Sequence, residues 1–168
     1  LVGSEMCIRD SMTLGFNLNL DYKGLDFATS LYASIGNDAV RSYERFLTYS
    51  NKSRLYLDRW TGEGTSNTTP RASTNASNNY LFSDFFVEDA SFLRIQNVQI
   101  GYSIPSSTLE KIKMDKVRLY VAANNLYTFT KYSGYNPDVS NANPSAAGVD
   151  LGQYPQTRTY TLGINVSF

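Results

Sequence analysis

Short segments in which apolar and polar residues alternate are the feature that most limits how this chain can fold. Between Thr13 and Tyr22, Leu14, Phe16 and Leu18 alternate with glycine and asparagine. A period of two places the two kinds of side chain on opposite faces of a β-strand. The pattern therefore predicts a strand with one apolar and one polar face.

The same alternation returns in four further segments, at 25–35, 92–105, 117–129 and 158–168. Lys23-Gly24 predicts a tight turn that joins the first two strands as a hairpin. Strands of about ten residues match the roughly 9–11 residues that a membrane-crossing β-strand needs. We therefore expect an all-β fold, an antiparallel transmembrane β-barrel fragment of about five strands from a larger barrel.

The segment 92–105 changes phase along its length. Leu93 and Ile95 stand at odd positions, whereas Val98 and Ile100 stand at even ones. A slip of one residue would turn the second half of the strand over. We therefore predict a β-bulge near Gln96-Asn97.

Two long interruptions separate the strands, at 36–91 and 131–157. In the first, helical spacing after a possible N-cap predicts a short helix over Asp38–Tyr49, and Gly62–Asn79 has the composition of an irregular loop. A capping-box pattern predicts one helical turn in Ser107–Asp115. Bacterial barrels combine short periplasmic turns with long outer loops, so both interruptions are expected outside the cell.

The composition agrees with a barrel wall. Charged residues make up 18% of the chain, while Tyr and Phe number 13 and 9. Few charges, many small polar residues and many aromatics suit a sheet with one wet face, one apolar face and aromatic girdles. The formal net charge is +0, so bulk attraction gives no reason to expect a nucleic-acid partner.

The chain offers no catalytic arrangement. It contains no His and a single Cys, Cys7, so neither a Ser-His-Asp nor a Cys-His arrangement can form from this chain alone. Glu88 and Asp89 are adjacent, but neighbours on a strand point to opposite faces. Their simpler interpretation is a solvated loop end or a salt bridge to Arg94. We expect no enzyme activity, no metal and no cofactor.

The first residues differ from the rest. Residues 1–12 share no pattern with the remainder of the chain, and the segment LVGSEMCIRDS lacks the basic start and apolar stretch of a secretory signal. It resembles a translated adapter sequence, so we interpret 1–12 as a non-native segment and 13–168 as the barrel part. An ordinary loop remains the alternative.

The aromatic residues fall into two groups. Those near strand ends are expected in interfacial girdles: Tyr22, Tyr102, Tyr160 and Phe168. Those in the predicted outer loops are candidates to stack on sugar rings or on apolar parts of a ligand, with plain loop packing as the alternative. They are Trp60, Tyr80, Tyr132 and Tyr135.

Alternation also assigns side chains to faces. The residues expected to face lipid are Phe16, Leu18, Leu31, Val121, Leu162 and Ile164. The residues expected to face the lumen are Asn17, Asn19, Ser30 and Asn165.

Three blocks in order carry a family resemblance: FFVEDASFLRIQNVQIGYSIP at 85–105, VRLYVAANNLYTFTKYSGYNP at 117–137, and the terminal TYTLGINVSF. From about Thr13 to Phe168 the chain resembles the C-terminal barrel part of SusC/RagA-type TonB-dependent outer-membrane transporters. The resemblance implies a plugged barrel of about 22 strands that imports oligosaccharides or peptides with a SusD-like surface lipoprotein. It also implies coupling to the TonB complex through an N-terminal region that this chain lacks, so the fragment alone is expected to be inactive.

The last strand resembles the signal that the barrel-assembly machinery reads in outer-membrane proteins. Its outward residues are Tyr160, Leu162, Ile164, Val166 and Phe168. Two other functions stay open at this point. One is a diffusive porin or adhesin-type barrel in the same membrane, and the other is a soluble β-sandwich carbohydrate-binding module.

Overall fold

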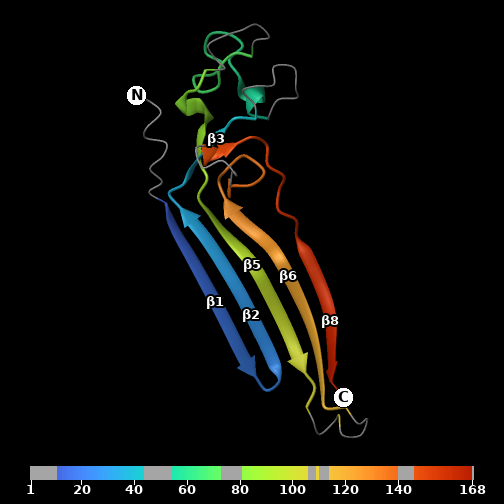
Figure 1. The fold of residues 1–168 in the computed structure, drawn as a ribbon. Coiled ribbons are helices and arrows are strands. Elements are labelled where there is room, and N and C mark those ends of the chain that lie inside the picture. The colour runs from blue at the N-terminus through green and yellow to red at the C-terminus, as the bar shows by residue number, and fades with distance from the viewer. Residues whose placement is uncertain are drawn as a thin grey trace.

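The computed structural model describes residues 11–43, 54–72, 81–105, 109, 114–139 and 146–167. The chain has two parts (Figure 1). One is a sheet of five long strands, called here the long sheet. The other, called here the loop body, comprises the described residues of 36–91 and 131–153 and lies beyond the upper end of the long sheet.

The long sheet contains all five strands that the alternation predicts. They are β1 (Met12–Tyr22), β2 (Leu25–Ile35), β5 (Phe92–Ser103), β6 (Lys116–Thr130) and β8 (Thr159–Ser167). Each strand pairs antiparallel with the next of these strands, in the order β1-β2-β5-β6-β8. β1 begins at Met12, which pairs with Ile35, one residue before the expected boundary at Thr13.

The register separates an apolar face from a polar face, because directly opposed residues of antiparallel strands project to the same side. One row of the apolar face contains Leu20, Phe27, Ile100, Val121 and Leu162. One row of the polar face contains Asn17, Ser30, Asn97, Asn124 and Thr159. The six residues predicted to face lipid share the first face, and the four predicted to face the lumen share the second.

The predicted bulge is confirmed in β5. The register between β2 and β5 shifts between Ser30 and Leu31, where Gln96 has no opposed residue. The pairing of β5 with β6 shifts at the same level, between Ile95 and Asn97. The extra residue returns Leu93 and Ile95 to the face of Ile100, so the apolar face stays continuous.

The hairpin turn between β1 and β2 is also confirmed. Lys23 and Gly24 both have positive φ, at 47° and 85°. A Cβ on Gly24 would stand 2.8 Å from the Ser103 carbonyl oxygen, and the Ser103 amide donates to the Gly24 carbonyl over 2.7 Å. Glycine is required here both by its conformation and by this close approach.

The loop body contains a small three-stranded sheet, ordered β4-β3-β7. Its strands are β3 (Asp38–Arg41), β4 (Val87–Asp89) and β7 (Val149–Asp150), and short 3-10 helices cover Arg54–Asp58 (η2) and Asp84–Phe86 (η4). β3 pairs antiparallel with β4 and parallel with β7.

The helix predicted over Asp38–Tyr49 is wrong at its start. Asp38–Arg41 is strand β3, and Val40 is paired on both sides, with Val87 and with Val149. These pairings with distant segments outweigh the local helical spacing. Residues 44–50 lie outside the described residues, as does most of Ser107–Asp115, of which Leu109 is helical. Residues 62–72 have neither helix nor strand, as predicted.

The core of the described structure lies in the loop body. Ala39, Ala90, Tyr132 and Val139 form a buried cluster. In the long sheet, by contrast, no second sheet covers either face within the described residues (Figure 1). A β-sandwich packs two sheets face to face, and the described residues of the long sheet form one layer. No helix in the described parts is long and apolar enough to span a membrane.

Candidate functional site

The loop between η2 and η4 holds Trp60, the first of the aromatic candidates. The Trp60 amide donates to the Thr69 carbonyl over 3.0 Å, which folds the loop back on itself. The Thr65 hydroxyl accepts hydrogen bonds from the amides of Thr61 and Gly62, at 2.9 and 3.1 Å. Side chains of Ser and Thr form such local bonds readily, which is why this composition gives a turn-rich loop rather than a strand.

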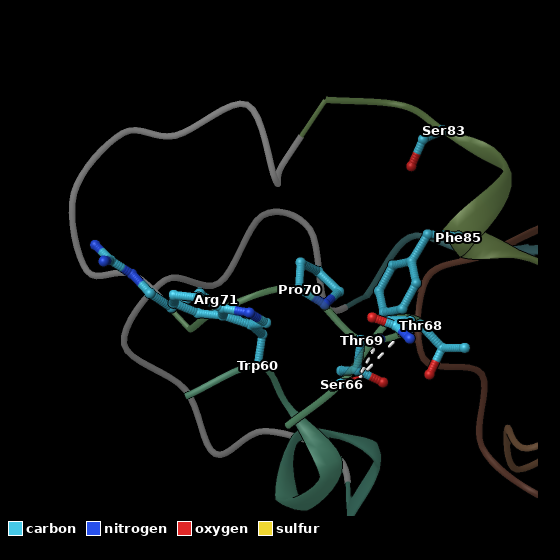
Figure 2. A pocket seen from close by; sticks show the side chains of 9 residues that line it. Trp60, Ser66, Thr68, Thr69, Pro70, Arg71, Ser83 and Phe85 are labelled. Atoms are coloured by element: carbon cyan, nitrogen blue, oxygen red, sulfur yellow. Dashed lines mark hydrogen bonds between the residues drawn. The ribbon is translucent and has the colours of Figure 1, made fainter. Parts of the chain in front are cut away.

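A cavity of about 410 Å³ opens beside the Trp60 side chain. Its lining residues are Trp60, Ser66, Asn67, Thr68, Thr69, Pro70, Arg71, Ser83 and Phe85. In Figure 2 Ser66 and Thr69 lie between Trp60 and the Phe85 ring, Pro70 lies above them, and the Arg71 side chain points away from Phe85. The volume is in the range of small-molecule sites, roughly 300–1,000 Å³. Of these residues, the sequence had singled out Trp60 alone.

Tyr132 has a structural position instead of a surface one. It is 6% exposed, and its hydroxyl donates to Oδ2 of Asp150 over 2.7 Å. Burial, together with this hydrogen bond, raises the pKa of the Tyr132 hydroxyl far above its usual value. The ring packs in the core of the loop body, so we assign Tyr132 to loop packing, the alternative that the sequence left open.

The other two aromatic candidates lie elsewhere. Tyr135 is 74% exposed, so its ring is open to a partner or a ligand. Tyr80 lies outside the described residues. The structure therefore brings Trp60 to a cavity and leaves Tyr135 on the surface, and it does not join the two in one site.

A network of charged groups connects the segments of the loop body. Arg41 is 2% exposed, and its Nε lies 2.6 Å from Oε1 of Glu88. Glu88 also accepts hydrogen bonds from the amide and the hydroxyl of Ser133, each at 3.0 Å. Glu88 thus holds β3, β4 and the start of the second long loop together, and it does not pair with Asp89 as an acid–base couple would.

Asp89 has a different role at the junction with the long sheet. Its carboxylate accepts from the Ser91 amide over 2.8 Å, and hydrogen bonds from Ser91 hold the pKa of the Asp89 carboxyl below its usual value. The Ser91 hydroxyl accepts from the Gly36 amide, and the Ser91 carbonyl accepts from the Thr130 hydroxyl. Ser91 therefore connects the ends of β2, β5 and β6 just below the loop body.

Arg94 ties the second long loop to the polar face of the long sheet. It is 2% exposed and does not reach Glu88 or Asp89, the salt bridge suggested by the sequence. Its guanidinium donates instead to Asn136 over 3.0 Å and to Asp138 over 3.2 Å. Since Arg94 stands on the polar face, the segment carrying Asn136 and Asp138 lies over that face at the upper end of the sheet.

The outward row of β8 is exposed within this segment. Leu162 and Ile164 are 80% and 62% exposed, and Tyr160 and Val166 are exposed as well. Phe168 lies outside the described residues. Among the described residues, no group of three or more His, Cys, Asp or Glu side chains is placed to hold a metal ion.

Comparison with known proteins places this arrangement among characterised relatives. No family model matches the chain. The chain is 32% identical over 164 residues to TonB-dependent receptor P3 of Formosa agariphila, covering 93% of this chain and 16% of the relative. It is 31% identical over 160 residues to TonB-dependent receptor SusC of Bacteroides thetaiotaomicron, covering 92% of this chain and 15% of the relative.

Solved structures give the same result. The RagAB peptide transporter superposes with a TM-score of 0.71 at 28% identity, over 92% of this chain and 17% of that chain. The RagAB peptide importer in its open-open state gives a TM-score of 0.70 at 27% identity, over 93% of this chain and 17% of that chain. The chain spans about one sixth of the length of the proteins it matches.

Proposed function

Because the chain is a segment of a SusC/RagA-type TonB-dependent receptor, we propose that it forms part of the wall and outer mouth of an outer-membrane importer. The matched relatives are receptors and transporters, not enzymes. The cargo in this proposal is an oligosaccharide or a peptide. The intact receptor takes up this cargo together with a SusD-like surface lipoprotein and draws energy from the TonB complex.

The observation that carries the proposal is the unbroken apolar face of the long sheet. Leu162 is 80% exposed and Val121 54% exposed, yet both belong to one continuous row across the five strands. An apolar surface of this extent on a single-layered sheet is unfavourable in water. In an outer-membrane barrel it meets lipid, while the opposite polar face lines the lumen.

The edges of the long sheet require further strands. Among the described residues β1 and β8 each pair along one edge. An unpaired strand edge cannot be satisfied inside a bilayer, and five strands are too few to close a barrel. The remaining strands of the intact receptor complete the pairing, and this segment alone does not transport.

The loop body is the proposed meeting place for cargo and lipoprotein. It stands at the end of the long sheet opposite the β1–β2 turn (Figure 1). Long loops of bacterial barrels lie outside the cell. The Trp60 cavity and the exposed Tyr135 ring offer contacts to a ligand or a partner in this part.

We also propose that the outward side chains of β8 contribute to recognition by the barrel-assembly machinery. These side chains alternate along a strand that has one edge open to pairing among the described residues. An incoming strand edge can be bound by β-augmentation, with alternate side chains in apolar pockets. Replacing Phe168 by Asp in the intact receptor should lower its amount in the outer membrane more than its uptake per assembled molecule. Normal surface amounts would contradict this role.

Deletion of Gly62–Asn79 in the intact receptor tests the transport proposal. We expect the barrel to assemble in normal amounts, because the described residues of this segment pair with no strand of the long sheet. Uptake of labelled oligosaccharide or peptide, and co-purification of the surface lipoprotein, should fall. A strain without TonB provides the reference for passive entry.

Unchanged uptake and unchanged lipoprotein docking in the deletion variant would contradict the outer-mouth assignment. Uptake that persists without TonB would contradict the energised mechanism and would indicate a diffusive porin. A deletion variant that fails to assemble would show that the loop body supports the barrel, contrary to the proposal.

A further inference from the structure

The upper end of the apolar face carries a guanidinium beside exposed aromatic rings. Arg158 directly precedes β8, and its Cζ lies 5.9 Å from the centroid of the Tyr127 ring on β6. We propose that Arg158 binds a phosphate group in the headgroup of an outer-leaflet glycolipid. This inference goes beyond transport, and it rests on the proposed placement of the long sheet in the outer membrane.

The register places Arg158 on the apolar face. Tyr127 pairs with Ile95, and Tyr160 pairs with Ala123, so both tyrosines belong to that face. Arg158 stands two residues before Tyr160, so alternation gives their side chains the same direction, and the contact with the Tyr127 ring agrees. Among the described residues, the paired rows of this face contain no charged side chain. Arg158 therefore places a charge at the upper end of an uncharged wall.

The length of β8 puts Arg158 at the level of the lipid headgroups. β8 begins at the end of the long sheet nearer the loop body and runs to the opposite end (Figure 1). Its 9 residues match the roughly 9–11 residues that cross a bilayer, so Arg158 lies just beyond the apolar layer. The rings of Tyr127, Phe129 and Tyr160 are exposed on the same face nearby. Aromatic belts of this kind mark the interface between lipid and water.

Local structure fixes the position of Arg158. Asn125 has a positive φ of 51° and lies where the pairing of β6 with β5 is interrupted. Asparagine adopts this conformation more readily than most residues. Its Nδ2 donates to the Thr157 carbonyl over 3.2 Å, which ties the residue before Arg158 to β6. The guanidinium is thereby held beside the Tyr127 ring, where a cation–π contact stabilises it.

The guanidinium has hydrogen-bond donors to offer an anion. Arg158 is exposed, and among the described residues no carboxylate forms a salt bridge with it. A guanidinium has five N–H donors, and a contact with one ring leaves donors over. It binds a phosphate through two parallel hydrogen bonds in addition to its charge. Arg158 is therefore suited to a phosphate that approaches from the lipid side of the long sheet.

The surroundings favour a lipid over a free anion. The side chains that follow Arg158 on the apolar face of β8 are Tyr160 and Leu162, and both are exposed. Acyl chains can lie on them while the headgroup meets the guanidinium, whereas a free phosphate gains only the second contact. The outer leaflet of a Gram-negative outer membrane consists largely of a glycolipid with phosphate groups on its sugar headgroup. Charge and apolar surface together fit this lipid.

The opposite end of the long sheet offers a matched cation. Lys23 lies in the β1–β2 turn, and its Nζ is 5.3 Å from the centroid of the Tyr22 ring. Tyr22 pairs with Leu25 on the apolar face. In the proposed orientation this pair faces the inner leaflet, which lacks the glycolipid. Lys23→Gln therefore removes a cation beside a tyrosine ring without touching the proposed site.

Local quenching in lipid vesicles tests the inference on the purified intact receptor. A Leu162→Cys variant, with any other cysteine of the receptor replaced, carries a fluorophore below Arg158. The vesicles contain phosphatidylcholine and a minor share of lipid A brominated in its acyl chains, either phosphorylated or dephosphorylated. We expect phosphorylated lipid A to associate with this site roughly fivefold more strongly than the dephosphorylated form, the gain typical of one cation near a charged membrane surface.

Three substitutions are compared in the labelled receptor. Arg158→Gln should bring the ratio of the two association constants close to one. Arg158→Lys should keep part of the preference, because it keeps the charge but not the paired hydrogen bonds. Lys23→Gln should leave the ratio unchanged. Heat-modified gel mobility confirms that each variant has assembled.

Equal association of the two forms of lipid A with the labelled receptor would overturn the inference. An unchanged ratio in Arg158→Gln, or an equal loss in Lys23→Gln, would do so as well. A preference abolished by millimolar inorganic phosphate at constant ionic strength would contradict the lipid and indicate a site for a free anion. These results would leave the proposed function standing as long as TonB-dependent uptake persists. No quenching by any brominated lipid would instead contradict the placement of the long sheet in the membrane.

Discussion

The long sheet and the loop body differ in how far their apolar side chains are exposed. In the long sheet, Leu162 is 80% exposed and Phe16 55% exposed, and no second sheet covers either face within the described residues. In the loop body, Tyr132 is 6% exposed and Phe86 1% exposed. The loop body has a small buried apolar core of its own, whereas the apolar face of the long sheet depends on what surrounds it.

The difference shows which interactions determine the structure of each part. The long sheet is specified by backbone pairing and by a surface that matches lipid on one side and water on the other. The loop body is specified by side chains, such as the Tyr132–Asp150 and Arg41–Glu88 pairs, in a small core. Substitutions should therefore act through the environment in the first part and through direct contacts in the second.

The largest expected effect comes from a charge on the apolar face. Val98 lies on that face near the middle of β5, and its neighbour Gln99 lies on the polar face. Val98→Arg in the intact receptor should cost about 2–4 kcal/mol near the bilayer midplane. Denaturant unfolding in detergent micelles and the amount of receptor in the outer membrane provide the measurements.

Gln99→Arg is the matched control, because it places the same side chain one residue away on the other face. We expect it to change the unfolding free energy by about 1 kcal/mol or less, as a lumen-facing substitution does. Equal losses for the two variants would break the comparison, since the faces of the long sheet would then be equivalent.

A smaller effect is expected on the polar face, where Gly163 lets the Tyr120 ring lie flat. A Cβ at Gly163 would overlap the ring of Tyr120, its paired residue, whereas a Cβ at Gly15 meets nothing within 4 Å. Gly163→Ala should cost about 1–2 kcal/mol by overpacking, and Gly15→Ala should be neutral or stabilising. Thermal unfolding of the two variants compares them, and a cost at Gly15 as large as at Gly163 would contradict the explanation.

In the loop body, Tyr132→Phe should have a local effect. This substitution removes the hydroxyl that donates to the Asp150 carboxylate. The carboxylate still accepts hydrogen bonds from the amides of Gly152 and Gln153, at 2.8 and 3.1 Å. The loss of unfolding free energy should therefore be about 1 kcal/mol. Hydrogen exchange of the Val40 amide, which donates to the Gly148 carbonyl, should speed up while barrel assembly stays normal. Reduced assembly would show that the two parts are not independent.

The smallest expected effect is a change with pH in the same region. Burial raises the pKa of Tyr132 in the folded state, so its stabilisation is complete below the unfolded pKa of about 10. Above that pH the opened state loses a proton that the folded state keeps, and the loop body loses stability. Hydrogen exchange of the Val40 amide, corrected for the intrinsic exchange rate at each pH, gives the free energy of local opening. In the wild type this free energy should fall as the pH rises above ~10, and in Tyr132→Phe it should fall less over the same range. Equal slopes would exclude this cause.

The long sheet could be predicted from the sequence because its information is local. Strands of nine residues or more, such as β8 and β6, show the period of two clearly. Even the bulge at Gln96 was visible, because the apolar residues change from odd to even positions. A surface shared with lipid and water imposes the same alternation on every strand.

The loop body could not be predicted in the same way. β3, β4 and β7 have 4, 3 and 2 residues, too few to display a period, and they pair across long stretches of chain. The helical spacing was therefore misleading at Asp38–Arg41, which is strand β3. The Trp60 cavity depends on Phe85 and Arg71, which only the fold of the loop brings to Trp60.

Lipid contact of the apolar face is the central claim, and single-cysteine labelling along β5 tests it most directly. Cysteines placed one at a time from Leu93 to Tyr102 in the intact receptor, in lipid vesicles, would carry a fluorophore exposed to lipids brominated in their acyl chains. The account predicts strong quenching at Val98 and Ile100 and weak quenching at Gln99 and Gly101. It also predicts a one-residue slip of the pattern at Gln96, where the bulge lies. Equal quenching at successive positions, or an alternation of opposite phase, would contradict the account.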